Sequence, residues 1–437
     1  AFRLSAFQAR GREAVLRKVQ VAELAVGMYV MDTGLSWLEY PYLYSREGVI
    51  ENAGALREIV EAGYEEAFID TERGSFGSAR AALVSRLTAS LGAAAAASDD
   101  AAKASTPESP AAPGKPGEQR PLAQSLAEAK TLYQDCLAIA HDVLREVRNG
   151  GEVNVAASET LIDDVITSAV HNRDAMVALA KLRVHDAYTF THGVNVAVLA
   201  VAFGAALGIS RQGLKQLGLA GLFHDLGKTG VPDAILNKPG PLSAQEFERI
   251  RDHPAHGCRL LAGRGLPDAV LRGVGEHHEK CDGSGYPQGL AGEAIHPFGR
   301  VLGVADVFDA LTSRRSYKDA MLPTRALGVL YGMRGRDFPA QLVERFIKFL
   351  GPYPVGSFVR LASGEYGFVR RGNPGRPLFP ELVLVLDFSG RPCAPRPLDL
   401  GGWQEGGPGI AQALDPDVFG LDPLDFLMQP GPEDALR

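Results

Sequence analysis

Two adjacent histidines, His277 and His278, are followed three residues later by a stretch of small and rigid residues, Asp-Gly-Ser-Gly-Tyr-Pro, over 282–287. Neighbouring side chains of a helix point about 100° apart, because the α-helix has about 3.6 residues per turn. The two imidazoles can therefore converge on one ion only where a helix ends and the backbone bends. The glycines of this stretch and Pro287 predict such an end. We interpret it as a pair of metal ligands attached to a shaped loop.

A second candidate pair, His224 and Asp225, ends the apolar helix that we expect over 214–223. Gly227 breaks this helix, and Lys228 places a cation next to the pair. An isolated His-Asp dipeptide is weak evidence for a site, but here a helix end presents both side chains together. The carboxylate can bridge two ions while the imidazole holds one.

Two further histidines lie at the ends of expected helices. His192 opens the apolar helix expected over 194–207, a position where a histidine on its own is more often a capped core residue than a ligand. His253 lies at a kink set by Pro254. We expect His256 to be a neighbour of the site rather than a ligand.

Two aspartates, Asp306 and Asp309, interrupt the apolar helix expected after Arg300. An aspartate within an apolar helix costs several kcal/mol unless it is paired or bound to a cation. Asp306 lies deeper in the apolar pattern and is the better ligand candidate. Asp309 is a candidate for capping or orienting another group.

The candidate ligands are five histidines and two carboxylates, more than one tetrahedral ion needs. They suit two six-coordinate ions of the first transition row, iron or manganese, with room for water. Such ions could share Asp225 and a water, whose pKa can fall from about 16 to about 7 to give hydroxide at neutral pH. The seven candidates are His192, His224, Asp225, His253, His277, His278 and Asp306.

A cationic, hydroxyl-rich stretch over 312–318 follows the last candidate ligand. Arg314, Arg315 and Lys318 from this stretch, together with Lys228, could hold phosphate oxygens. The alternative for the stretch is a solvated turn. With the metal candidates, these cations predict metal-assisted hydrolysis of a phosphodiester, in which hydroxide attacks phosphorus in line.

The first part of the chain differs from the region that carries these residues. Residues 13–87 mix short strand-like and helical patterns and contain no histidine. They predict a small α+β module with a structural or regulatory role. Residues 88–122 are rich in alanine and proline, and predict a linker because such a composition cannot bury enough apolar surface to offset chain entropy.

Helical patterns continue over 123–352, followed by strand-like patterns with turn signals from 355. Residues 353–437 predict a small β appendage and a flexible tail from Gly401. The expected fold class is therefore mainly α, with a helical catalytic domain, a small α+β N-terminal domain and a short β appendage.

Composition limits the functional class. A net charge of −7 and a hydrophobic content of 46% argue against a general nucleic-acid coat, which needs a basic face. Four scattered cysteines without a Cys-x-x-Cys pair predict a reducing compartment, and hence the cytoplasm. We expect no membrane span, because the longest apolar run is too short. We expect no signal peptide either, because residues 1–20 lack an apolar block.

These residues resemble a known family, the HD-GYP branch of the HD phosphohydrolases, over roughly residues 155–350. The block 13–87 is similar to the small module that often precedes HD-GYP domains in bacteria. The residues that carry the resemblance are His224, Asp225, Lys228, His253-Pro254, the stretch 277–287, the stretch 306–313 and the stretch 315–318.

The resemblance implies an all-helical catalytic domain that hydrolyses the bacterial second messenger cyclic di-GMP to linear pGpG, with further cleavage to GMP left open. It implies that the seven candidates hold metal and that Lys228, Arg315 and Lys318 contact substrate phosphates. It also implies that the loop of Gly285, Tyr286 and Pro287 forms part of the pocket wall.

One position departs from the family pattern. Some members carry a glutamate four residues before the first ligand histidine, where it holds a third ion. This chain has Tyr188 there, and a neutral tyrosine is a poor ligand. We therefore expect two divalent ions per chain rather than three.

Two other functional classes remain. The first is a weakly active cyclic di-GMP sensor or adaptor that docks a partner, such as a diguanylate cyclase or another signalling protein. Broken ligands or a missing Gly-Tyr-Pro would indicate it, and neither is found. The second is a hydrolase of another cyclic dinucleotide or of a nucleoside polyphosphate. The Gly-Tyr-Pro loop disfavours polyphosphates but does not separate the cyclic dinucleotides.

Overall fold

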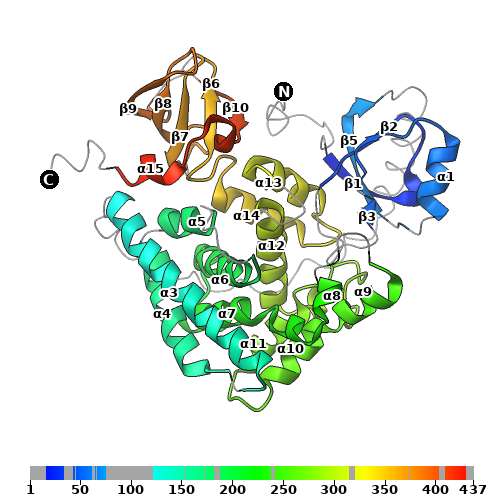
Figure 1. Cartoon of the computed structure of the whole chain (residues 1–437). Coiled ribbons are helices and arrows are strands. Elements are labelled where there is room, and N and C mark those ends of the chain that lie inside the picture. Colours follow the sequence, from blue (N-terminus) through cyan, green and yellow to red (C-terminus); the bar gives the residue numbers. More distant parts are fainter. Residues whose placement is uncertain are drawn as a thin grey trace, which may run out of the picture. The chain divides into compact units, whose positions relative to one another are not determined.

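A computed structural model shows two compact units, which are described separately. The first consists of described residues between 16 and 74, and the second of described residues between 122 and 429 (Figure 1). None of the described helices is long and apolar enough to cross a membrane. The structure describes residues 16–33, 43–44, 46–61, 64, 66–74, 122–151, 153–171, 173–181, 188–236, 238, 242–313, 320–373, 375–402 and 409–429.

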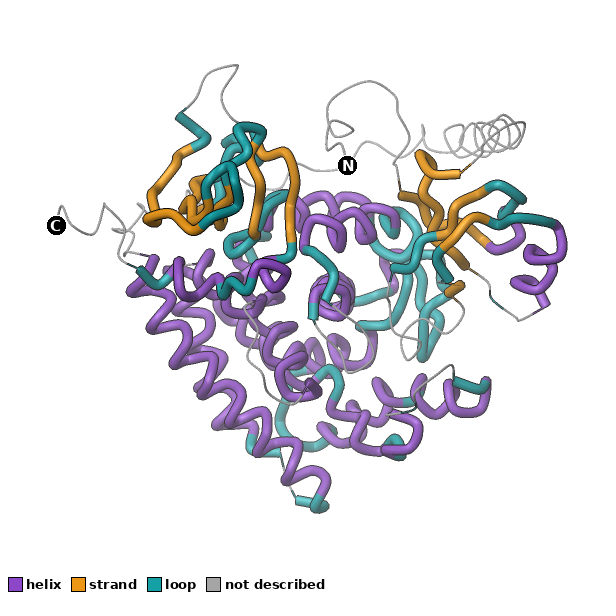
Figure 2. Tube along the Cα trace, turned by 45° about the horizontal axis from the view of Figure 1, so that its top comes forward, coloured by secondary structure: helices purple, strands orange, loops and turns teal. Residues whose placement is uncertain are grey.

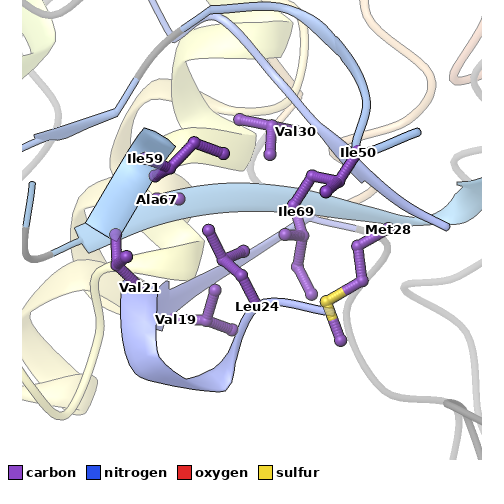
Figure 3. Packing of buried hydrophobic residues seen from close by; sticks show 9 residues of the cluster. All are labelled: Val19, Val21, Leu24, Met28, Val30, Ile50, Ile59, Ala67 and Ile69. Atoms are coloured by element: carbon purple, nitrogen blue, oxygen red, sulfur yellow. The ribbon is translucent and has the colours of Figure 1, made fainter. Parts of the chain in front are cut away.

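The first unit is a five-stranded sheet with one helix, α1 (Ala53–Glu61). Its strands follow the order β1-β5-β2-β4, and β3 pairs in parallel with β5. Alternate residues of β5 face the helix, so that Ala67 and Ile69 pack with Ile59 (Figure 3). The strands are β1 (Leu16–Gln20), β2 (Met28–Val30), β3 (Leu43–Tyr44), β4 (Gly48–Val49) and β5 (Glu66–Gly74).

The second unit combines a bundle of helices with a group of strands (Figure 2), and all of these strands follow helix α14 in the chain. The helices are α3 (Leu122–Arg148), α4 (Val155–His171), α5 (Arg173–Lys181), α6 (Tyr188–Ala206), α7 (Arg211–Phe223), α8 (Asp233–Leu236), α9 (Ala244–Arg251), α10 (His253–Leu261), α11 (Asp268–Glu276), α12 (Pro297–Thr312), α13 (Pro323–Gly332) and α14 (Ala340–Leu350).

Two helices, α6 and α12, form the centre of this bundle because their sequences are apolar around the whole helix. Every residue from 298 to 311 is buried except Arg300, and α6 packs against α3, α4, α5, α7 and α12. Helices α6 and α7 approach closely at Gly221, where an added Cβ would lie 2.8 Å from the Ala197 Cα. Polar side chains that face this centre must therefore find partners in it.

The ends of the surrounding helices follow local sequence signals. Ser210 caps α7 by accepting a hydrogen bond from the Gly213 N–H at 3.2 Å. Ser243 and Glu246 form the predicted capping box of α9. Pro254 occupies the first turn of α10, where its missing N–H costs nothing.

The β appendage is a five-stranded antiparallel sheet in the order β10-β6-β7-β8-β9. Short helix α15 (Pro423–Leu427) follows it and contacts β7, β8 and α3. The strands are β6 (Phe358–Leu361), β7 (Tyr366–Arg371), β8 (Glu381–Leu386), β9 (Pro392–Asp399) and β10 (Ile410–Leu414).

The tail from Gly401 was expected either to dock loosely or to be disordered, and its described residues 409–429 dock, because Ile410–Leu414 pairs with β6 and Leu427 is buried. Apolar residues spaced along the glycine- and aspartate-rich tail drive this docking. Strand β9 also escaped prediction, since its three prolines disfavour a strand. It lies at the edge of the sheet, where proline is tolerated.

Candidate metal centre

Five elements of the helical bundle deliver the seven candidate ligands to one place. His192 lies in α6, His224 is the C-cap of α7, and Asp225 follows it. His253 begins α10, His277 is the C-cap of α11 with His278 next to it, and Asp306 lies in α12. The ends of α7 at Phe223 and of α11 at Glu276, and the start of α10 at His253, are thus the features that make these side chains converge.

The side-chain atoms fall into two groups, and within each the candidate ligand atoms lie within 4.8 Å of one another. The first group contains Asp225, His253, His277 and His278, and the second contains His192, His224 and Asp306.

Asp225 lies between these two groups. Its Oδ1 is 3.3 Å from the Nε2 of His253, and its Oδ2 is 3.5 Å from the Nε2 of His224 and 3.8 Å from the Nε2 of His192. One carboxylate oxygen therefore faces each group. This is the arrangement that a bridging ligand requires.

Three of the histidines are held by a backbone carbonyl of the preceding turn of the chain. The Nδ1 atoms of His224, His253 and His277 each lie 2.7 Å from the carbonyl oxygen three residues earlier. A carbonyl oxygen only accepts, so each Nδ1 carries the proton and donates it. In the neutral rings, each Nε2 then offers a lone pair to the centre. This orientation is typical of metal-binding histidines.

The resulting lone pairs fit a cation. The Nε2 atoms of His253 and His277 lie 3.3 Å apart, and with both protons on Nδ1 no donor stands between them. The buried Nε2 atoms of His224 and His278 have no hydrogen-bond partner among the described residues. Lone pairs that face one another without a donor are satisfied by a positive ion, so the residues present fit divalent metals.

The electrostatics of the first group also favour metal binding. Burial, followed by the neighbouring imidazoles, lowers the pKa of His277 and His278 well below the ordinary 6.5. Burial alone would raise the pKa of Asp225, but Lys228 and His224 lower it well below 3.8. The rings are therefore neutral and the carboxylate is ionised, which are the forms that bind metal.

His192 differs because two carboxylates contact its ring. Its Nε2 is 2.9 Å from Asp306 Oδ1, and its Nδ1 is 2.8 Å from Asp309 Oδ2. Burial alone would lower the pKa of His192, but these contacts raise it to about 10. A proton between His192 and Asp306 occupies the place that a cation would take. Asp309 has the orienting role that was one of its two predicted alternatives.

The loop after the histidine pair is fixed from inside. Glu279, which is 3% exposed, accepts hydrogen bonds from the N–H groups of Gln288 at 2.7 Å and Leu290 at 2.9 Å. The Tyr286 ring stacks on the His278 ring, with centroids 4.7 Å apart. Gly285 packs against backbone so tightly that an added Cβ would lie 2.3 Å from the Lys280 N.

This geometry shows how the loop meets the candidate ligands. Tyr286 is buried, with 6% exposure, and its ring stacks on His278, while the contribution of the loop to a pocket wall stays a prediction. Glu279 was missed, although a glutamate directly after a ligand pair and before a glycine-rich loop was a usable signal. Among the candidate ligands and Lys228, the most exposed side chains are those of Asp225 at 13%, His278 at 8% and Lys228 at 14%.

Other predicted residues have different outcomes. His256 contacts the carbonyl oxygen of Gly227 through Nδ1 at 2.9 Å, and belongs to neither group, as expected of a neighbour. The Lys228 ammonium lies 2.7 Å from Asp225 Oδ2. Arg314, Arg315 and Lys318 lie outside the described residues, as does the side chain of Tyr188.

Comparisons with known proteins identify the family of this chain. A family profile described as "HD domain" matches residues 169–342, and one described as "Domain of unknown function (DUF3391)" matches residues 16–158. A cyclic di-GMP phosphodiesterase of Pseudomonas aeruginosa is 33% identical over 391 residues, which are 89% of each chain.

Further matches cover smaller shares of the chain. The cyclic di-GMP phosphodiesterase response regulator RpfG of Xanthomonas campestris is 43% identical over 32% of this chain and 38% of its own length. The 3'3'-cGAMP-specific phosphodiesterase 2 of Vibrio cholerae is 37% identical over 37% of this chain and 31% of its own. The solved structure of Bd1817 from Bdellovibrio bacteriovorus covers 76% of this chain and 98% of its own, with 17% identity and a TM-score of 0.43.

Proposed function

The chain belongs to the HD-GYP family of HD-domain phosphohydrolases and is a phosphodiesterase, and from this premise we propose that it hydrolyses cyclic di-GMP with two divalent metal ions. The observation that carries the proposal is the pair of ligand groups that share Asp225. Iron or manganese suits this mixture of imidazole and carboxylate ligands.

Each group would hold one ion. His253, His277 and His278 would hold the first, and His192, His224 and Asp306 the second, with Asp225 between them. When bound, such ions lower the pKa of a water and offset the negative charge that develops on a phosphate.

The remaining steps belong to the chain. The backbone carbonyls behind His224, His253 and His277 keep each Nε2 aimed at the centre, so the ligands need no reorganisation during the reaction. Lys228 keeps a positive charge beside Asp225, which favours an anionic phosphodiester. We propose that Arg314, Arg315 and Lys318 contribute further phosphate contacts.

The products follow from the bond that breaks. Water adds at phosphorus and one ester P–O bond of the cyclic substrate breaks. The ester oxygen takes up a proton and becomes a sugar hydroxyl, and the product is linear pGpG. A second cleavage would give GMP. We propose a cytoplasmic enzyme that works without nucleic acid, and a diguanylate cyclase or other signalling protein stays a predicted partner.

A related substrate is a specific alternative, because 3'3'-cGAMP-specific phosphodiesterases are among the similar proteins. The match along 89% of both chains to a cyclic di-GMP phosphodiesterase favours cyclic di-GMP.

The test is incubation of the purified protein with Mn²⁺ or Fe²⁺ and, in separate samples, cyclic di-GMP or 3'3'-cGAMP, followed by chromatography of the products. We expect pGpG from cyclic di-GMP at the higher kcat/KM. Faster turnover of 3'3'-cGAMP would replace the proposed substrate, and no turnover of either would refute the proposed function.

A further inference from the structure

A chain of buried polar groups runs from α3 to the metal centre. The hydroxyl of Tyr133, in α3, donates to Asn195 Oδ1 at 2.5 Å. The Asn195 Nδ2, in α6, donates to Asp309 Oδ1 at 2.9 Å. Asp309, in α12, accepts from the Nδ1 of His192 at 2.8 Å through its other oxygen. All four residues are at most 6% exposed.

The direction of each hydrogen bond is set by Asp309. An ionised carboxylate only accepts, so Asn195 must turn its amide N–H₂ and His192 its Nδ1–H toward it. Asn195 then presents its carbonyl oxygen to α3, and Tyr133 must donate. At the other end, His192 is left with Nε2 facing Asp306 and the second group of ligands.

This support differs from that of the other rings. His224, His253 and His277 are oriented by backbone carbonyl groups three residues earlier in the chain. His192 is oriented by the side chain of Asp309, which is hydrogen-bonded to Asn195, and Asn195 is in turn hydrogen-bonded to Tyr133 of α3. A displacement of α3 can therefore change the orientation of the His192 ring without changing the backbone at His192.

We propose that Tyr133 and Asn195 are positioning residues for the metal ligand His192, so that the seating of α3 sets how well the second ion is held. The proposal rests on the metal centre of the proposed function and extends it to residues outside the ligand set. Tyr133 and Asn195 act only through Asp309, which carries their effect to the ring.

Helix α3 belongs to the same matched region of the chain as the N-terminal unit. The profile that matches residues 16–158 includes α3 together with the N-terminal unit. In the structure, α3 packs against α5 and α6 of the helical bundle. Tyr133 thus links a helix matched with the N-terminal region to a ligand of the metal centre.

The test uses full-length Tyr133→Phe, Asn195→Leu and the double variant. Phenylalanine removes only the hydroxyl, and leucine keeps the approximate shape of asparagine. The readouts are Mn²⁺ affinity of the metal-free protein by calorimetric titration, kcat and KM for cyclic di-GMP, and the Tm of the metal-free protein. Tyr353→Phe is the matched control, because Tyr353 is also buried, with 6% exposure.

Removal of an outer contact to a ligating histidine weakens metal binding by roughly 10- to 100-fold. We expect Asn195→Leu to weaken binding of one of the two ions by ~10-fold and Tyr133→Phe, one bond further away, by ~3-fold. Both should lower kcat at low Mn²⁺ and leave KM unchanged, and high Mn²⁺ should restore kcat. Tyr353→Phe should match the wild type.

The double variant shows whether Tyr133 and Asn195 act on Mn²⁺ affinity through one chain of contacts or independently. If Tyr133 acts only through Asn195, the double variant binds Mn²⁺ like Asn195→Leu alone. Multiplied effects of the two substitutions would overturn the proposal, as would wild-type Mn²⁺ affinity in Tyr133→Phe. If Asn195→Leu fails to fold, the Mn²⁺ affinities of Tyr133→Phe and of its control Tyr353→Phe still test the proposal. Absence of Mn²⁺ binding by the wild type would instead refute the proposed function.

Discussion

The substitution Gly285→Ala tests whether the loop after the histidine pair supports a ligand. The Cβ would lie 2.3 Å from the Lys280 N, 2.5 Å from the Glu279 Cα and 2.6 Å from the His278 O. These are backbone atoms, so no side chain can rotate to make room. The loop itself must move.

The size of the movement follows from these distances. Ordinary contact begins at 3.4 Å, so the closest pair must separate by 3.4 − 2.3 = 1.1 Å. Overpacking of this kind costs about 1–3 kcal/mol of stability. The movement would also shift Tyr286 from the His278 ring on which it stacks. A displacement of about 1 Å near a reacting centre can lower the rate by ~10²-fold.

The assay is kcat/KM for cyclic di-GMP, with bound metal and Tm measured on the same sample. We expect Gly285→Ala to lose activity by ~10²-fold, to hold less metal and to unfold at lower temperature. Gly328→Ala is the matched control, because Gly328 lies in α13 and a Cβ there has no atom within 4 Å. It should keep full activity and gain roughly 0.5–1 kcal/mol in helix stability. Wild-type activity and metal content in Gly285→Ala would refute the claim that the loop supports His278.

Three further outcomes follow from contacts elsewhere. Glu279→Ala removes the buried carboxylate that accepts hydrogen bonds from the N–H groups of Gln288 and Leu290, which should lower the free energy of unfolding in urea by about 1–3 kcal/mol; an unchanged midpoint would contradict this. The hydrogen bond from Lys238, followed by those from a capping serine, lowers the pKa of Glu246 to about 2 from 4.5. The stability it contributes is therefore complete above pH 4.5 and lost as pH falls toward 2, so the Tm difference between wild type and Glu246→Gln should shrink on acidification rather than grow. Chelation of metal should lower Tm, and Mn²⁺ at 100 times its Kd should restore about 2.7 kcal/mol; a Tm indifferent to chelator would argue against a metal centre in the core.

The candidate ligands could be predicted from the sequence because each one marks the end or the interruption of an apolar helix. Gly227 predicted that the helix before it stops close to His224, Pro254 predicted the helix boundary at His253, and Asp306 stood out because a carboxylate in an apolar helix needs a partner. These are local signals, and the structure brings the residues together at the distances that the chemistry needs.

The supporting residues could not be predicted in the same way. Tyr133 and Asn195 are 62 residues apart in sequence, and Tyr133 fits the apolar face of its helix as well as phenylalanine would. The inward position of Tyr286 depends on packing against His278 and Phe247, which a glycine-rich loop pattern does not specify. Strand β9 was hidden by prolines that only its edge position allows.

The central claim is that Asp225 joins two ligand groups into one catalytic metal centre. The most direct test compares wild type, Asp225→Ala and the surface control Asp163→Ala after purification without oxygen. Elemental analysis and cyclic di-GMP turnover are measured on the same samples. We predict about two ions per chain in the wild type and the control, as the two groups suggest. In Asp225→Ala, at least one ion should be lost, and turnover should fall by ~10²-fold or more, since metal stabilisation is worth several kcal/mol. Full metal content with unchanged turnover in Asp225→Ala would show that Asp225 does not join the two groups into a catalytic centre.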